Sequence, residues 1–320
     1  MNIDNLEIKN ELGSGMYGTV YLAEYNNKEY ALKIEHVIEK DLNKNIKSPV
    51  WREIDFYNKF AKRYPTQFMK LYTYDFIENC EHKQEYTYDL KSFDKNRQTE
   101  FKKLAKSKYC VRKVYSKIDT TLAQIIEELN KKQLLSLIIQ YLYIIYLLEK
   151  HGYIHGDFHP NNIGVIKTDQ EFIKIFNYNI PTYGYIFQAI DYGSILNKKY
   201  KMNSEEKHYF KKMFRNEWFG LIYFNIIVKE PFMKNKDINK QVKLFKKTRA
   251  NIILQEYSDN IIHRFFLYRL FNPKKHQELI MGKKFVITEY PELLIPIEDI
   301  IYMVKTSKTS KILEYFLEKI

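Results

Sequence analysis

Three of the ten glycines in this chain fall within six residues, in the sequence Gly13-Ser14-Gly15-Met16-Tyr17-Gly18. Strand-like residues lie on both sides, at 6–12 and at 19–24. In a dinucleotide-binding unit the third glycine opens a helix, but here a strand pattern follows it. We therefore expect a strand-turn-strand flap suited to lie over phosphates. The same glycines also suit a tight hairpin that needs positive φ angles, and that interpretation stays open.

Strand patterns dominate the first third of the chain. A third strand is predicted at 29–34, after the turn Asn26-Asn27, and two more at 71–78 and 109–115. Ser48 followed by Pro49 predicts the start of a helix that ends before Pro65, with the serine as its cap. The polar stretch 79–108 between the last two strands is interpreted as an insertion.

Helical patterns dominate the remainder. Apolar residues recur at helical spacing over 122–129, and the most apolar stretch of the chain covers 134–148. This stretch is shorter than the roughly 20 residues that span a bilayer, and lysines flank it. We expect a helix buried nearly all round rather than a membrane span.

The size and composition allow a large core. The chain has 320 residues, of which 45% are hydrophobic and 28% charged, as in globular proteins. The switch from strands to helices near residue 115 predicts an α+β fold in two parts, 1–115 and 116–320, joined by a hinge near 114–117.

The net charge of +13 admits two explanations. It comes from 44 Lys and only 8 Arg, whereas nucleic-acid readers favour Arg for bidentate contacts. Lys, Asn, Ile and Tyr are all abundant and all have AT-rich codons, so the excess is better explained by codon bias. We expect no nucleic-acid or membrane partner, and at most a preference for acidic substrates.

The two cysteines, Cys80 and Cys110, are too few for a disulfide framework and do not form a C-x-x-C motif. This usage favours a reducing, cytoplasmic setting. No apolar or Arg-rich targeting pattern is visible at residues 1–12.

Charged residues of functional interest follow the glycine cluster. The strand Tyr30-Ala31-Leu32-Lys33 ends in a lysine, and Glu53 lies 20 residues further on in the predicted helix. A strand lysine held by a helix glutamate places an ammonium against nucleotide phosphates. A lysine simply exposed to solvent is the alternative.

The segment His155-Gly156-Asp157-Phe158-His159-Pro160-Asn161-Asn162 directly follows the apolar helix. An Asp with an Asn five residues later can place a carboxylate beside an attacking hydroxyl while the amide oxygen ligates magnesium, and Asp191 supplies a second carboxylate. Zinc binding by His155 and His159 is disfavoured, because no Cys or H-E-x-x-H glutamate accompanies them.

In this order, the glycine loop, Ala-Leu-Lys, the helix glutamate, His-Gly-Asp…Asn and Asp191-Tyr-Gly resemble the protein-kinase-like superfamily. The resemblance covers about 6–193. The composition also resembles that of divergent Ser/Thr protein kinases of large DNA viruses, which implies the host cytoplasm or the virion. The implied fold is a small antiparallel β lobe with one helix and a larger, mainly helical lobe.

The resemblance implies a role for each matching residue. Gly13, Gly15 and Gly18 would close over the phosphates of ATP, and Val20 and Ala31 would cover the adenine. Lys33, paired with Glu53, would contact the α and β phosphates. Asp157 would accept the proton of the substrate hydroxyl, and Asn162 and Asp191 would hold magnesium.

Several positions depart from the family pattern. Gly156 replaces the usual catalytic-loop arginine, and His159 replaces a lysine that faces the γ-phosphate. His-Gly-Asp-x-His-Pro is similar to the loop of aminoglycoside and choline kinases. An insertion is predicted at 167–185. No Ala-Pro-Glu follows Asp191, and Ser204 is expected to cap a new helix. The segment 216–220 is only a loose echo of the family's later Asp-x-Trp helix, and ordinary core is its preferred interpretation.

Three function hypotheses follow. The first is an ATP- and magnesium-dependent kinase acting on protein Ser/Thr hydroxyls, favoured by the complete glycine loop and its spacing to Lys33. The second is a small-molecule kinase of the aminoglycoside and choline type, favoured by His159 and the missing Ala-Pro-Glu. The third is a pseudokinase scaffold, disfavoured because Lys33, Asp157 and Asp191 are all present.

Overall fold

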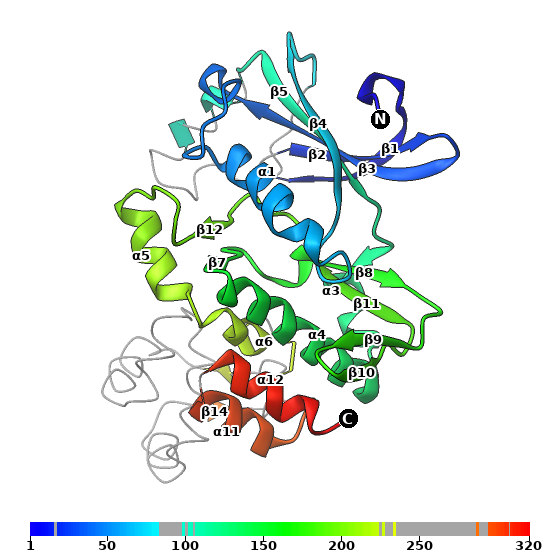
Figure 1. The fold of residues 1–320 in the computed structure, drawn as a ribbon, viewed down its shortest axis with the longest axis vertical. Helices are drawn as coiled ribbons and strands as arrows, with labels where there is room; N and C mark the ends of the chain where they lie inside the picture. The colour runs from blue at the N-terminus through cyan, green and yellow to red at the C-terminus, as the bar shows by residue number, and fades with distance from the viewer. Residues whose placement is uncertain are drawn as a thin grey trace.

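The structure is a computed structural model (Figure 1), and it describes residues 1–15, 18–82, 98–99, 102–104, 106–223, 226–227, 233–234, 286–287, 294–306 and 308–320. Two features predicted from the sequence lie partly outside these residues. They are the tip of the glycine cluster at 16–17 and most of the insertion at 79–108.

A five-stranded antiparallel sheet forms the N-terminal part, in the order β1-β2-β3-β5-β4. Its strands are β1 (Glu7–Gly15), β2 (Gly18–Tyr25), β3 (Lys28–Val37), β4 (Leu71–Glu78) and β5 (Tyr109–Ser116). All five predicted strands are confirmed. Asn26 and Asn27 join β2 to β3 with φ angles of 52° and 59°, as a type I′ hairpin turn requires.

Helix α1 (Pro49–Lys59) begins at the predicted proline and ends before Pro65. The predicted cap is wrong: the Ser48 side chain makes no capping hydrogen bond, and its Oγ is buried without a partner among the described residues. The helix is instead secured by Arg52, whose guanidinium lies 2.6 Å and 3.2 Å from the two carboxylate oxygens of Glu206.

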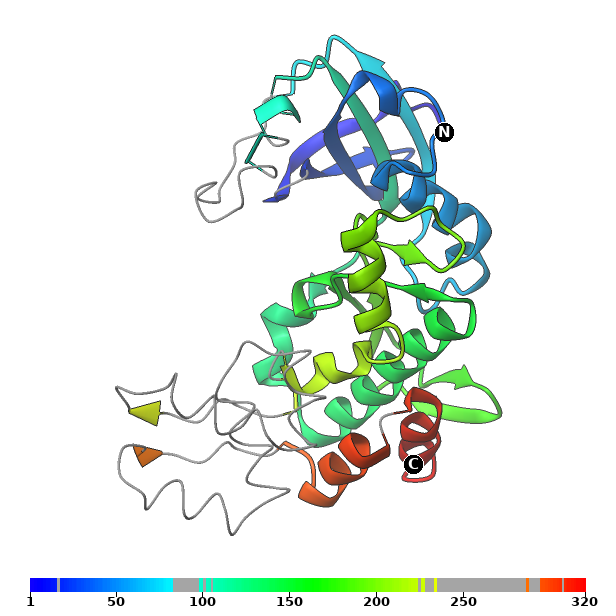
Figure 2. The ribbon, with the colours of Figure 1, turned by 90° about the vertical axis from the view of Figure 1, so that its left-hand side faces the viewer.

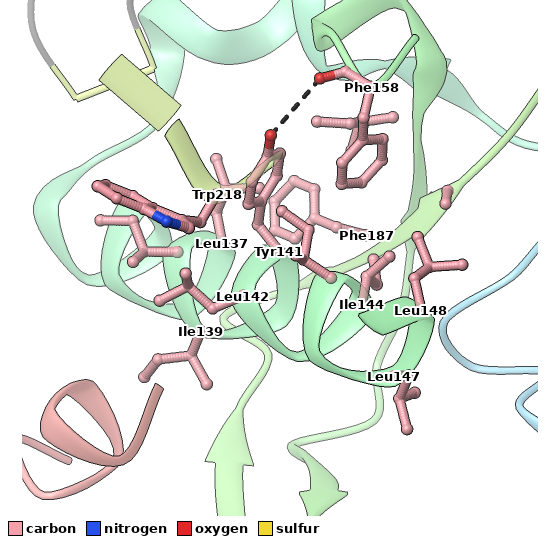
Figure 3. Packing of buried hydrophobic residues seen from close by; sticks show 14 of the residues in the cluster. Leu137, Ile139, Tyr141, Leu142, Ile144, Leu147, Leu148, Phe158, Phe187 and Trp218 are labelled. Carbon is pink, nitrogen blue, oxygen red and sulfur yellow. Dashed lines mark hydrogen bonds between the residues drawn. The ribbon is translucent and has the colours of Figure 1, made fainter. Parts of the chain in front are cut away.

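The apolar stretch forms helix α4 (Lys131–Lys150), the centre of the C-terminal part. Asn130 caps it through hydrogen bonds from the amides of Lys132 and Gln133. Figure 3 shows Leu137, Tyr141, Leu142 and Ile144 packed with Phe158, Phe187 and Trp218. By length and composition alone this helix could span a membrane. However, 67% of its most apolar 18-residue stretch is buried inside the protein, which confirms the prediction of a core helix.

Short strands before and after α4 pair with one another. β8 pairs with β11 and with β6, β7 pairs with β12, and β9 pairs with β10. These strands are β6 (Thr120–Thr121), β7 (Tyr153–Ile154), β8 (Ile163–Lys167), β9 (Phe172–Ile175), β10 (Tyr178–Pro181), β11 (Tyr185–Ala189) and β12 (Leu196–Asn197). The β9–β10 hairpin occupies the predicted insertion at 167–185. It contacts α4, because Ser136 Oγ donates a hydrogen bond to the Pro181 carbonyl at 2.6 Å.

The other described elements are helical, apart from one two-residue pair. The α-helices are α3 (Leu122–Ile125), α5 (Ser204–Met213), α6 (Gly220–Tyr223), α11 (Ile297–Thr306) and α12 (Thr309–Leu317), and β13 (Met233–Lys234) pairs with β14 (Val286–Ile287). Single 3-10 turns are η1 (Ile3–Asn5), η2 (Glu39–Asp41), η3 (Ala61–Arg63), η5 (Ile126–Glu128), η6 (Pro160–Asn162) and η7 (Glu217–Phe219). Helix α5 is capped by Asn203, one residue before the predicted Ser204.

Figure 2 shows the five-stranded sheet at one end of the molecule with α1 beside it, and α11 and α12 near the other end. The fold is therefore mixed α/β with an antiparallel sheet and several helices, as predicted in outline. One apolar cluster fills the outer face of the sheet, around Leu32, Ile34 and Val114. A larger cluster extends from Ala31 and α1 through α4 to α12.

Cys80 and Cys110 form a disulfide, across a sequence separation of 30. The sequence analysis, which found two cysteines too few for a disulfide framework, did not predict this single bridge. The inference of a reducing compartment rested on this cysteine usage and loses its support.

Candidate active site

Lys33 lies on β3, on the face of the sheet that is turned toward the helices. Its Nζ lies 2.6 Å from a carboxylate oxygen of Glu35 and 3.1 Å from Oδ1 of Asp191, which follows β11. Only 10% of the Lys33 side chain is exposed. Two residues 158 positions apart in the sequence therefore meet in one ion pair, and the predicted solvent-exposed alternative for Lys33 is wrong.

Glu53 does not pair with Lys33, which corrects the sequence prediction. Its carboxylate accepts a hydrogen bond from Nζ of Lys113 on β5 at 2.5 Å and one from the Tyr115 hydroxyl at 2.8 Å. Lys113 also pairs with Glu35, the residue that occupies the place predicted for Glu53 beside Lys33. The physical reason is strand geometry: residues i and i+2 share one face of a strand, and Lys33 and Lys113 are register partners.

The result is a buried chain of alternating charges, Asp191–Lys33–Glu35–Lys113–Glu53. Burial disfavours the ammonium of Lys33, but Asp191, Glu35 and Glu53 outweigh it and raise its pKa well above the usual value. Burial likewise opposes ionisation of Glu35, but Lys113 and Lys33 lower its pKa. These groups stay charged because each has a partner of opposite sign.

Asp191 is held in its ionised form. Burial opposes the charge, but Lys33, Lys113 and the Gly193 amide together lower its pKa to about 2. Its backbone has a φ of 54°, which is uncommon for a residue with a side chain. The side chain is 42% exposed, so one flank of the carboxylate contacts Lys33 while the other is open.

Asp157, His159 and Asn162 form a second cluster in the loop after β7. Asn162 Nδ2 lies 2.8 Å from the Asp157 carbonyl oxygen, 3.3 Å from Asp157 Oδ2 and 3.2 Å from His159 Nε2. His159 Nε2 is also 3.5 Å from the Asp157 carboxylate. The Ile190 amide donates to the Asn162 carbonyl at 3.0 Å, which connects this loop to the segment that leads from β11 to Asp191.

These residues fit a hard cation such as magnesium. All three contacts of the Asn162 side chain use Nδ2, so its Oδ1 is left for another partner. Asp191 supplies an ionised carboxylate oxygen, and magnesium prefers oxygen ligands of this kind. The two donors named from the sequence are thus chemically suitable.

Glu217, a buried residue of η7, binds the backbone of the loop after β7. Its two carboxylate oxygens accept hydrogen bonds from the amides of His155 at 3.0 Å and Gly156 at 2.8 Å. His155 is fully buried, and its Nε2 contacts the Ile190 carbonyl oxygen at 2.9 Å. Trp218 and Phe219 are core residues, which confirms the interpretation of 216–220 as core, and Glu217 in the same segment additionally positions the loop.

The backbone explains the departure at Gly156. Its φ is +84°, and an added Cβ would lie 2.4 Å from the Ser194 carbonyl oxygen. An arginine has no room here. Tyr209 of α5 instead donates its hydroxyl to the Gly156 carbonyl at 2.6 Å.

The glycine cluster is not explained by positive φ, because none of Gly13, Gly15 and Gly18 has it. Gly18 is required by packing: an added Cβ would lie 2.4 Å from the Ile34 carbonyl oxygen. Gly13 and Gly15 face open space, with no heavy atom closer than 3.9 Å to an added Cβ. The open space beside Gly13 and Gly15 would let a ligand approach the backbone closely, which is one reason for glycine at these positions.

Val20 and Ala31 lie on the same face of the sheet as Lys33 and pack toward the helices. Val20 is the register partner of Lys33 on β2. The two apolar residues named for the adenine therefore share a surface with the lysine named for the phosphates.

Sequence reasoning missed three residues of this site: Glu35, Lys113 and Glu217. Glu35 had a detectable signal, since it stands two positions after Lys33 on a predicted strand. Lys113 and Glu217 had no comparable signal, because their partners lie 60 or more positions away.

A cavity of about 380 Å³ lies elsewhere, between α1 and the β7–β12 pair, and is lined by residues including Asp55, Lys59, Tyr153 and Tyr200. None of the site residues named from the sequence lines it.

No protein-family model and no curated protein sequence matches this chain. Among solved structures, one titled "Structure of vaccinia related kinase 3" is similar with a TM-score of 0.36 and 15% sequence identity. The match covers 60% of this chain and 48% of that one, so the chain spans about half the length of that structure. Similarity at this level does not assign the chain to a family.

We expect Gly156→Ala to destabilise the protein much more than Gly184→Ala. Both glycines have strained positive φ angles, of +84° and +89°, but no heavy atom lies within 4 Å of an added Cβ at Gly184. Backbone strain costs each variant about 1–2 kcal/mol. The clash with Ser194 adds about 1–3 kcal/mol for Gly156→Ala alone. Urea unfolding followed by circular dichroism measures both; equal losses would contradict the clash.

Stability should depend on pH through Glu217. Burial raises its pKa to about 7 from a usual value of 4.5, against the hydrogen bonds from the Gly156 and His155 amides. The folded state therefore binds more protons than the unfolded state between these values, and the contribution of Glu217 to stability falls as pH rises through this window. The stability advantage of wild type over Glu217→Gln should shrink by roughly 3 kcal/mol between about pH 4.5 and pH 7.

Comparing the two proteins at each pH cancels the opposite contribution of His155, whose pKa burial lowers. Glu128→Gln, at an exposed position, is the matched control and should give a profile parallel to wild type. A Glu217→Gln profile parallel to wild type would show that Glu217 does not titrate in this range.

Proposed function

We propose that this chain is an ATP- and magnesium-dependent phosphotransferase with a two-lobed kinase-like fold, dividing near residues 115 and 116. The observation that carries the proposal is the contact between Lys33 and Asp191 at 3.1 Å, beside the Asp157 and Asn162 cluster. Four residues from three separate motifs therefore lie near one another where the sheet meets the helices. The motif order in the sequence supports the same function.

The charges of the site suit a nucleotide triphosphate. Lys33 is a permanent cation that is paired with Glu35. Its ammonium group could exchange Asp191 for the α and β phosphates and still keep Glu35 as a partner. Asn162 Oδ1 and the open flank of Asp191 would hold magnesium, which bridges phosphate oxygens and neutralises charge. Gly13 and Gly15 permit close approach of the backbone, and Val20 and Ala31 offer an apolar surface for adenine.

Asp157 is proposed as the residue that orients the acceptor hydroxyl and takes its proton. Its side chain is 55% exposed, so an acceptor can reach it, and Asn162 restrains its carboxylate. His159 lies within 3.5 Å of the same carboxylate and is proposed to face the transferred phosphoryl group.

The acceptor is proposed to be a Ser or Thr hydroxyl of a protein, from the complete glycine loop and its spacing to Lys33. One observation favours the alternative of a small-molecule acceptor. Only residues 192–203 separate Asp191 from α5, and β12 within them pairs with β7. This short segment leaves little surface for docking a peptide.

Transfer of labelled phosphate from ATP tests the proposal. With magnesium, we expect the protein to label either generic protein acceptors or members of a panel of amino alcohols and aminoglycosides. Asp157→Asn should lower kcat at least about 100-fold, because general-base assistance contributes 10²–10⁴-fold. Asp169→Asn, at an exposed loop position, is the matched control and should leave the rate unchanged.

Two results would contradict this proposal. Transfer at the wild-type rate by Asp157→Asn would exclude that residue as the base. Binding of ATP with no transfer to any acceptor, or to the protein itself, would favour a pseudokinase scaffold.

Glu35 rather than Glu53 should control the use of ATP. Glu35→Gln removes a direct partner of Lys33, whereas Glu53→Gln leaves Lys33 paired with Glu35 and Asp191. We expect Glu35→Gln to lower kcat/KM for ATP about tenfold more than Glu53→Gln does. Unfolding measurements on both variants correct for lost stability. A larger loss of kcat/KM in Glu53→Gln than in Glu35→Gln would contradict this prediction and favour Glu53 as the functional partner of Lys33.

A further inference from the structure

A second cluster of reactive side chains lies on the face of the sheet opposite Lys33. It consists of His36 on β3, Cys110 on β5 and Cys80 just beyond β4. The ring nitrogen and the two sulfurs offered by these residues all lie within 4.8 Å of one another. Sequence analysis did not identify this cluster, because strand pairing makes His36 and Cys110 register partners although they lie 74 positions apart.

The cluster is well enclosed but accessible from one side. Cys110 is fully buried and His36 is 8% exposed, while Cys80 is only partly buried. In the structure the two sulfurs are joined as a disulfide. Cys80 therefore gives a soluble reductant or a cation a route to the cluster.

His36 is oriented as a metal ligand would be. Its Nε2 lies 2.8 Å from the His82 carbonyl oxygen, the shorter of its two contacts to carbonyl groups. Assigning the ring hydrogen to Nε2 leaves Nδ1 with its lone pair, 3.6 Å from Cys110 Sγ and 3.1 Å from the Ser107 carbonyl oxygen. Metal-bound histidines commonly donate their other ring N–H to a backbone carbonyl in this way.

With the ring hydrogen on Nε2, the lone pair of Nδ1 faces the Ser107 carbonyl oxygen and Cys110 Sγ, which also carry lone pairs. A cation placed among them would relieve the repulsion of their lone pairs. The ligand spacing also suits zinc, because tetrahedral bonds of about 2.3 Å to sulfur and about 2.05 Å to nitrogen put the two ligand atoms about 3.6 Å apart. This equals the observed separation of Cys110 Sγ and His36 Nδ1.

We propose that Cys80, Cys110 and His36 form a redox-controlled binding site for a soft divalent cation of the zinc class. The reduced protein binds the cation through two thiolates and His36 Nδ1, and oxidation to the disulfide releases it. A second imidazole, His82, stacks on His36 with ring centroids 5.8 Å apart. His82 lies outside the group of mutually close ligand atoms, so the cluster itself supplies three protein ligands and leaves the fourth position of a tetrahedral cation to water.

The chemistry of the exchange balances. A dithiol reductant gives two electrons and two protons to the disulfide, breaking the S–S bond to yield two thiols while its own sulfurs join. Zinc then displaces one proton from each thiol and binds the two thiolates. In the reverse direction, an oxidant of the disulfide class takes two electrons from the thiolates, the S–S bond forms and zinc leaves.

Both states close the same loop. Cys80 and Cys110 stand where the chain leaves the sheet after β4 and returns to β5, and the Cys80 amide donates to the Lys108 carbonyl at 2.8 Å. The disulfide or the cation therefore ties the two ends of 79–108 together, while the chain that is reduced and metal-free has no such tie.

The test is a metal titration of the full chain in two redox states. Reduced with a phosphine, which does not compete as a thiol would, the protein should bind one equivalent of zinc. Cobalt should bind in the same place and give a thiolate-to-metal charge-transfer absorption. The oxidised protein should bind neither, and because it is the native chain, this comparison does not depend on any variant folding.

Substitutions then identify the ligands. Cys80→Ser, Cys110→Ser and His36→Ala should each weaken zinc binding at least about tenfold in the reduced state. His208→Ala, at an exposed position on α5, is the matched control and should bind as wild type does. Equal zinc binding by the oxidised and reduced proteins, or full binding by Cys80→Ser, would overturn the proposal, as would no binding at micromolar zinc.

Discussion

The candidate site depends on one buried row of alternating charges, Asp191–Lys33–Glu35–Lys113–Glu53. The four ions from Lys33 to Glu53 are removed from water, which costs several kcal/mol per ion, and the neighbours of opposite sign compensate for it. Asp191 ends the row with one flank open to solvent. The row links β3, β5, α1 and the segment after β11. Each of these elements is therefore joined to another by an ion pair. Lys113, which is completely buried, depends on Glu35 and Glu53 together. An ion at the middle of such a row cannot be exchanged without leaving another unpaired.

The sequence predicted the elements of this fold better than their contacts. The five strands of the sheet and the start of α1 depend on local patterns, and the structure confirms them. The Lys33–Glu53 pair was wrong because the competing partner, Glu35, is chosen by strand alternation and the competing lysine by β3–β5 register. The disulfide escaped prediction for the same reason, since register rather than spacing brings Cys80 and Cys110 together. Glu217 was underrated because its role is to accept backbone hydrogen bonds, which leave no pattern in side-chain types.

The departures from the family pattern have local physical causes. Gly156 stands where the backbone turns with positive φ against Ser194, and its carbonyl is bound by Tyr209 instead of by a neighbouring arginine side chain. The loop therefore relies on α5 and η7 for its position. The residues that fix this loop, Glu217 and Tyr209, therefore belong to the helical part of the protein and bind the backbone just before Asp157.

The pair formed by Arg52 and Glu206 has a mechanical consequence. The Arg52 side chain is 4% exposed, and Glu206 is at the same time the capping partner of Asn203, whose amide donates to its carboxylate at 2.9 Å. A displacement of α1 away from α5 would break a nearly buried ion pair and unravel the first turn of α5 in the same movement. The ion pair therefore joins α1, which carries Glu53, to α5, which carries Tyr209, and so connects the two parts of the site by a route separate from the Lys33–Asp191 contact.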